Sequence, residues 1–260
     1  MSYLEFTVLL YLIISYILCM SLFHSDAFLA FRSRDFSLLS VNQLCLILAI
    51  MIQEVVIAYS VYQLTQNPLS LGMIALIELL PFICLSLISG DWADRYNRQK
   101  IVQWSFSCST LIPLLFIVLF SQYQQQHIQQ NTLLCGIYSL IFCLGILRGI
   151  YSPSFNSLRP FLTPESAYSN AATWTALIWQ MGGILAPLCA GLLLGQLGLE
   201  KTLFIVFFLC CVGSICLFGL SPRQFPSPHK QHLSKSLKEA YLFIFKHPLM
   251  FWSMLLDLSA

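Results

Sequence analysis

Hydrophobic residues along this chain form long continuous runs, and short polar segments separate them. Each run has about 20 residues, the length that a helix needs to cross the hydrocarbon core of a bilayer. The runs are continuous and do not alternate with polar residues, so they predict transmembrane helices and not the strands of a barrel. Six such runs fall within residues 27–220: Leu39–Val61, Leu71–Ser89, Ile101–Phe120, Leu133–Tyr151, Ala171–Leu194 and Leu203–Leu220.

The two ends of the chain give less regular patterns. Leu4–Phe23 is apolar but lacks a basic start and a small-residue cleavage site, so it is a poor signal peptide. Residues 1–26 are therefore either an extra transmembrane helix or a mis-assigned start, with Met20 as the alternative. Residues 221–247 predict a cytoplasmic linker, in which Leu233–Lys246 is either a short interfacial helix or a plain polar linker. Residues 248–260 have the pattern of a seventh span that is too short to cross.

Composition supports a membrane protein. Hydrophobic residues make up 58% of the 260 positions and charged residues only 9%, against roughly 25% charged in soluble domains. We therefore expect an all-α polytopic membrane protein whose partners include the lipid bilayer and not nucleic acid. The cysteines lie in apolar runs without metal spacing, and no phosphate-binding glycine loop or nucleophile constellation is visible. The sequence thus predicts no enzyme, no metal and no cofactor.

The basic residues are distributed unevenly between the loops. Of the 13 Lys and Arg residues, all except Lys201 alternate onto one side of the predicted membrane; Arg148 and Arg159 are assigned to that side as flanks of one turn. Cytoplasmic loops carry the excess of Lys and Arg. The loops after the second, fourth and sixth spans are therefore predicted to be cytoplasmic, in a multi-pass protein of the cell (inner or plasma) membrane.

A polar island interrupts the apolar pattern between the second and third runs. Such a cluster of charges must lie in water, so we expect a loop over residues 90–100. Its order is Gly-x-x-x-Asp-Arg-x-x-Arg-x-Lys. The residues that carry this island are Gly90, Asp91, Asp94, Arg95, Arg98 and Lys100.

This order resembles the loop signature of the major facilitator superfamily, Gly-x-x-x-Asp-Arg-x-Gly-Arg-Arg/Lys. Asn97 replaces the second glycine, and we expect it to adopt the same left-handed turn, which asparagine tolerates. Gln99 replaces a base, with Lys100 one position later. Arg148-Gly149 is similar to the arginine motif of the family's fourth span. Residues 31–36, residues 61–65 with 68–72, and Trp179-Gln180 resemble the enterobactin exporter-like subgroup of drug and siderophore exporters.

The resemblance implies a fold and an activity. It implies the six-helix N-terminal half of a twelve-helix transporter, whose two halves rock around a midplane site. It implies proton-coupled export of a small-molecule substrate, a drug or a siderophore, driven by the proton gradient. The island would act as a gate latch, with Asp94 facing a helix N-terminus of the C-terminal six-helix half. That half is missing here, so we expect the chain to be inactive alone.

Two other functions remain open from the sequence. The chain is alternatively a non-transporting membrane protein, either a truncated remnant or an assembly partner. It is also compatible with an importer of the same fold, because these residues do not encode direction.

Three ionisable residues lie inside predicted spans, where charge is costly and marks function. Counted at 1.5 Å per residue, Glu54 lies about 24 Å from the start of its run and Glu78 about 12 Å from the start of its own. Both fall in the outer half, whereas Arg148 falls in the inner third and matches neither acid in depth. Desolvation favours a protonated carboxylate, so Glu54 or Glu78 is a candidate proton carrier. The alternative is a structural hydrogen bond or a contact with the outer vestibule.

Small and polar residues complete the candidates. In the fifth span, two adjacent rows of small residues are predicted to face another helix closely. The fifth-span motif, which resembles the glycine-rich motif of proton-coupled exporters, is Gly182, Gly183, Ala186, Pro187, Ala190 and Gly191. Candidate cavity-lining residues are Gln43, Gln53 and Gln180, with Trp174, Trp179 and Tyr59 as aromatic walls.

Overall fold

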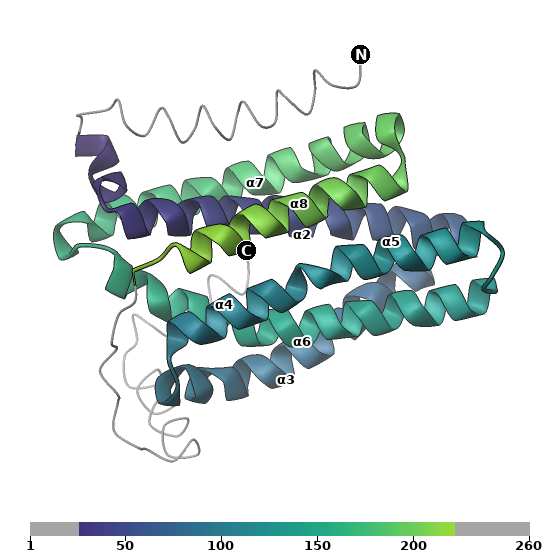
Figure 1. Cartoon of the computed structure of the whole chain (residues 1–260), viewed down its shortest axis with the longest axis horizontal. Coiled ribbons are helices and arrows are strands. Elements are labelled where there is room, and N and C mark those ends of the chain that lie inside the picture. Colours follow the sequence, from purple (N-terminus) through teal and green to yellow (C-terminus); the bar gives the residue numbers. More distant parts are fainter. Residues whose placement is uncertain (1–25, 222–260) are drawn as a thin grey trace.

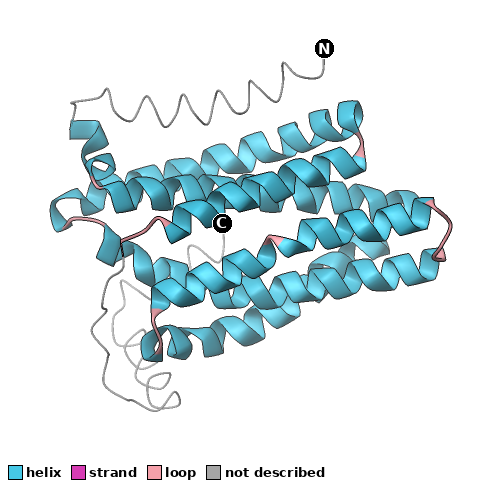
Figure 2. Cartoon of the chain, viewed as in Figure 1, coloured by secondary structure: helices cyan, strands magenta, loops and turns pink. Residues whose placement is uncertain are grey.

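The computed structural model describes residues 26–221 and shows a bundle of helices (Figure 1, Figure 2). The extra N-terminal span, the interfacial linker helix and the start of a seventh span lie outside the described residues. The elements are η1 (Asp26–Arg32), α2 (Arg34–Thr65), α3 (Leu69–Arg95), α4 (Arg98–Ser109), α5 (Leu111–Gln124), α6 (Gln130–Leu162), η2 (Glu165–Ala167), α7 (Tyr168–Leu197) and α8 (Leu199–Phe218).

Six segments of the described chain are long and apolar enough to cross a membrane, with α4 and α5 counted as one. They coincide with the six predicted spans, so the all-α architecture is confirmed. The helices are longer than the apolar runs: α2 begins at Arg34, and α6 ends at Leu162 and not at Tyr151. Helices extend because their polar ends continue the same hydrogen-bonded ladder beyond the apolar core.

The third span is divided into α4 and α5 at Thr110. Pro113 follows three residues later and has no N–H to donate to the carbonyl of Ser109, four residues earlier. A missing bond at this position interrupts or kinks a helix. The sequence predicted one continuous helix over Ile101–Phe120, and the proline explains the break.

The helices form two packed groups. α2 packs against α7 and α8, while α3 packs along α6, and α4 and α5 bridge α6 and α8 (Figure 1). α2 lies in the interior: 56% of its most apolar segment is buried, against 11% for the segment of α3. Most of the α3 surface is therefore free to face lipid or another protein surface.

The polar island is mostly helical, which corrects the expected loop. α3 continues through Gly90 to Arg95, and α4 begins at Arg98, so only Tyr96 and Asn97 connect them. Asn97 is extended (φ −66°, ψ 105°) and not left-handed, and its side chain accepts a hydrogen bond from the Lys100 amide. Asn97 is thus the N-cap of α4, a role that asparagine fills well.

One end of the bundle gathers the starts of α2 and α4 and the ends of α6 and α8. Arg98 Nη1 donates to the Ser157 carbonyl of α6 at 3.4 Å, and Gln99 Nε2 donates to the Leu220 carbonyl at 3.2 Å. The Ser221 hydroxyl donates to Asp35 Oδ1 at 3.1 Å. The ends that carry most of the described basic residues therefore lie together.

Candidate functional site

A cavity of about 630 Å³ lies between the helices. Most of its lining comes from α2, α3 and α6, while α4 adds three residues and α5, α7 and α8 add one residue each. The lining is apolar except for a few charged and amide side chains. Its charged residues are Glu54, Glu78, Arg148 and Arg159.

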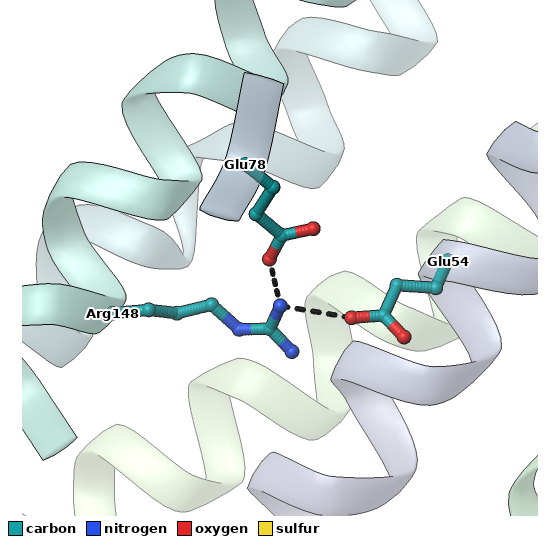
Figure 3. Close-up of polar contacts among 3 residues, drawn as sticks. All are labelled: Glu54, Glu78 and Arg148. Carbon is teal, nitrogen blue, oxygen red and sulfur yellow. Dashed lines mark ion pairs between the residues drawn. The ribbon is translucent and has the colours of Figure 1, made fainter. Parts of the chain in front are cut away.

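Two carboxylates share one guanidinium in this cavity (Figure 3). Arg148 Nη1 lies 2.8 Å from Glu54 Oε1 and also contacts Glu78 Oε1. The Glu78 side chain is 16% exposed, against 27% for Arg148 and 47% for Glu54. We call these three residues the ionic triad. With all three ionised it carries one excess negative charge among apolar neighbours.

This contact corrects the predicted depth of Arg148. Sequence counting placed Arg148 in the inner third, away from both acids, because it ended the fourth span at Tyr151. α6 instead runs from Gln130 to Leu162, and Arg148 lies near its middle, about 27 Å from the start at 1.5 Å per residue. Arg148 therefore lines the cavity. It does not count among the loop charges from which the orientation in the membrane was predicted.

Two glycines bring α6 against α3, a packing role that the sequence analysis did not predict. A Cβ added to Gly145 would lie 2.4 Å from the Glu78 carbonyl oxygen and 2.7 Å from Pro81 Cγ. At Gly149 an added Cβ would lie 3.0 Å from the Phe82 carbonyl oxygen. The available signal was the Gly-x-x-x-Gly spacing, which allows close approach of membrane helices. Arg148 lies between the two glycines, so the close packing of α6 on α3 places its guanidinium in contact with Glu78.

A proline in α6 frees a carbonyl that forms a hydrogen bond to α3. Pro153 has no N–H for the carbonyl of Gly149, four residues earlier. Ser89 of α3 donates its hydroxyl to this carbonyl at 2.7 Å, and the bond is buried. Serine side chains commonly satisfy backbone groups that proline frees in membrane helices. This hydrogen bond holds α3 beside the turn of α6 that follows Arg148.

The part of the cavity beyond the triad is aromatic. Tyr151 donates to Asn42 Oδ1 at 2.8 Å, and Asn42 Nδ2 donates to the Gly213 carbonyl at 3.0 Å, so α2, α6 and α8 are joined through buried polar groups. Tyr151 stacks on Phe155 with centroids 5.0 Å apart and an interplanar angle of 21°. Phe106 of α4 contacts the same tyrosine.

The predicted cavity glutamines divide into two groups. Gln43 and Gln53 are buried and line the cavity, whereas Gln180 is exposed and does not. Among the aromatic candidates, Trp179 lines the cavity. Trp174 instead packs on Phe28 and Phe31, at 5.0 Å in each case, and Tyr59 is 51% exposed outside the lining.

The small-residue motif of α7 also divides. Gly182, Ala186 and Ala190 are buried, and a Cβ on Gly182 would lie 2.5 Å from Ile47 Cγ2 of α2. Neither Gly183 nor Gly191 has an atom within 4 Å of such a Cβ, and Pro187 is exposed. Within the described residues, close packing is thus seen for the row of Gly182, Ala186 and Ala190, and close packing of the other row stays a prediction.

These features agree with comparisons to known proteins. The chain matches the Major Facilitator Superfamily over residues 39–259 and belongs to it. It is 24% identical over 208 residues to the uncharacterized MFS-type transporter YfiS of Bacillus subtilis (strain 168), covering 77% of this chain and 46% of that protein.

Two further relatives carry functional names. The multi-drug resistance efflux pump PmrA of Streptococcus pneumoniae is 28% identical over 133 residues, which is 51% of this chain and 30% of that protein. The Staphyloferrin A transporter of Staphylococcus aureus (strain NCTC 8325 / PS 47) is 25% identical over 128 residues, 49% of this chain and 31% of that protein. The matched part spans less than half the length of each of these relatives.

Proposed function

We propose that this chain is the N-terminal half of a proton-coupled exporter, with the ionic triad as the proton site. The observation that carries the proposal is the single Arg148 nitrogen shared by Glu54 and Glu78 in a cavity between membrane-spanning helices. One guanidinium balances only one carboxylate. A proton on either acid neutralises the triad, and its release restores an excess negative charge in an apolar setting, where charge is costly.

Proton binding would also change contacts between helices. Glu54 lies on α2, Glu78 on α3 and Arg148 on α6, so protonation of one acid releases a tie between two of these helices. The more exposed acid, Glu54, is the one that water in the cavity reaches first. In this proposal, protonation of Glu54 loosens α2 from α6 while Glu78 keeps Arg148 in place.

The proposal also includes orientation, the gate and the second half. The end of the bundle that holds Arg98, Gln99 and Leu220 is assigned to the cytoplasm by its basic residues. The island there would latch against a C-terminal six-helix half, which would also cover the open faces of α3 and α7. A chain without that half is expected not to transport. Drugs and siderophores are the proposed substrates, in line with the names of two relatives.

The test uses inverted membrane vesicles that contain the chain alone or with its second half. Sequencing the coding DNA beyond codon 260 identifies that half, and the absence of a six-span frame there contradicts the two-half proposal. A panel of drugs and siderophores is offered under an imposed proton gradient, and accumulation is measured. Glu54→Gln and Glu78→Gln are expected to abolish gradient-driven accumulation, while Glu200→Gln, in the first turn of α8, leaves it intact. Unchanged accumulation in both cavity variants contradicts the proton role.

A further inference from the structure

The spacing of polar residues on α2 and α6 repeats after 11 residues. Arg148 and Arg159 are 11 residues apart, about three turns or about 16 Å, so they share the cavity face of α6. On α2, Gln43 and Glu54 have the same separation. The two helices run antiparallel (Figure 1). Glu54 therefore lies opposite Arg148, and Gln43 lies opposite Arg159, to which it is hydrogen bonded at 3.2 Å.

Within the described residues, the partners of the second arginine, Arg159, are neutral. Arg159 Nη2 donates to Gln43 Oε1, and its guanidinium lies 5.1 Å from the centre of the Phe155 ring. Its Nε is buried and makes no hydrogen bond within residues 26–221. Where Arg148 meets two carboxylates, Arg159 meets an amide, the uncharged isostere of glutamate. Arg159 is partly buried, and removing a guanidinium from water without pairing it to an anion costs free energy.

The side chains around Arg159 are held in place by further hydrogen bonds and ring contacts. Gln43 Nε2 donates to the Thr175 carbonyl of α7 at 3.3 Å, so the amide that orients Arg159 is itself fixed. The next turn of α6 presents Phe155 stacked on Tyr151, and Asn42 fixes the hydroxyl of that tyrosine. The planar guanidinium of Arg159 therefore lies beside the stacked rings of Phe155 and Tyr151, which we call the aromatic wall of the cavity. Guanidinium groups bind carboxylates through paired, charge-assisted hydrogen bonds.

We propose that Arg159, Gln43 and the Phe155–Tyr151 wall form an anion subsite, which binds the carboxylate of an amphipathic organic anion. The aromatic wall takes the apolar body of the same molecule. This inference rests on the proposed function, because it assumes that the cavity receives the substrate. It adds the substrate class and separates the subsite from the ionic triad, which lies about 16 Å away along α6.

The test compares three probes with one aromatic body: naphthalene-2-carboxylate, 2-naphthylmethanol and 2-naphthylmethylammonium. Binding to the purified full chain in phosphatidylcholine nanodiscs is measured by isothermal titration calorimetry. The carboxylate is expected to bind about tenfold or more tighter than the alcohol, as a charge-assisted hydrogen bond supplies. Arg159→Gln removes this preference, and Arg159→Lys retains part of it. Gln43→Glu supplies an internal carboxylate and weakens binding of the anionic probe.

The matched control is Arg34→Gln, an exposed arginine in the first turn of α2, which keeps the full preference. Unchanged binding of the alcohol by Arg159→Gln shows that its cavity is folded. Equal affinity for carboxylate and alcohol, or a preference that survives Arg159→Gln, overturns the proposal. Loss of the carboxylate-over-alcohol preference in phosphatidylglycerol nanodiscs, at a salt concentration that screens the membrane charge, also overturns it, because an anionic lipid headgroup is then the occupant. The assay has no proton gradient, so its failure leaves the proton role of the triad untouched.

Discussion

Replacing Gly145 with alanine tests how tightly α3 and α6 are packed. The added Cβ would lie 2.4 Å from the Glu78 carbonyl oxygen, and ordinary contact begins at 3.4 Å, so the helices must separate by about 1 Å. The blocking atom belongs to the backbone, which cannot rotate away as a side chain does. Overpacking of this kind costs about 1–3 kcal/mol. The shift also moves Arg148, three residues later, away from Glu78.

Gly183→Ala is the matched control. Gly183 lies within α7, and no atom is within 4 Å of its added Cβ, so only the gain in helix propensity of about 0.5–1 kcal/mol remains. Thermal unfolding of the full chain in detergent micelles reports both variants. We expect a lower Tm for Gly145→Ala and an unchanged or higher Tm for Gly183→Ala. Equal Tm values for the two variants refute the close contact.

A double-mutant cycle connects this packing to the triad. If Gly145→Ala already separates Arg148 from Glu78, then the ion pair is weakened before Glu78 is replaced. Glu78→Gln then removes a smaller interaction energy than it does in the unmodified chain. The two substitutions are then expected to cost less together than the sum of their separate effects, by about 0.5–3 kcal/mol, the range for residues in contact. Strict additivity would mean that the glycine contact and the ion pair are independent.

Other substitutions test single interactions by the same unfolding measurement. Glu78→Gln lowers the free energy of unfolding by about 1–3 kcal/mol, and Glu54→Gln lowers it less because that pair is more exposed; the reverse order contradicts the burial of the triad. Tyr151→Phe leaves Asn42 Oδ1 without its donor and costs about 1–3 kcal/mol, and a neutral effect would mean that the bond is absent. Asn97→Ala costs about 0.5–2 kcal/mol, while Asn97→Gly costs only a few tenths; equal costs argue against the cap.

Apolar runs predicted the number and order of the spans because a bilayer enforces continuous apolar helices of similar length. The ends of the helices followed other rules. Polar residues such as those of Gly90–Arg95 extend a helix into water as readily as they form a loop, so charge alone did not locate the turn. The turn lies where Asn97 caps α4. A break within a span, as at Thr110, depends on the position of Pro113 and not on hydropathy.

The sequence predicted which charged residues belong to the candidate site, but it did not predict that both acids contact the arginine. Glu54, Glu78 and Arg148 stood out because charge inside a span is rare. Their meeting depends on the register between helices, which Gly145 and Gly149 set through the closeness of α3 and α6. Counting depth from the end of an apolar run misplaced Arg148, since α6 extends eleven residues beyond Tyr151. Helix length and interhelical register are tertiary properties, and hydropathy encodes neither.

The two arginines of α6 show how partner helices assign different chemistry to equivalent positions. Arg148 and Arg159 share one face, and each meets a side chain from α2 at the same 11-residue interval. The acid at one level and the amide at the other decide which guanidinium is balanced and which keeps its charge available. Neither α2 nor α6 alone contains this difference. It arises from their antiparallel register, so any shift of α2 against α6 changes both levels of the cavity together.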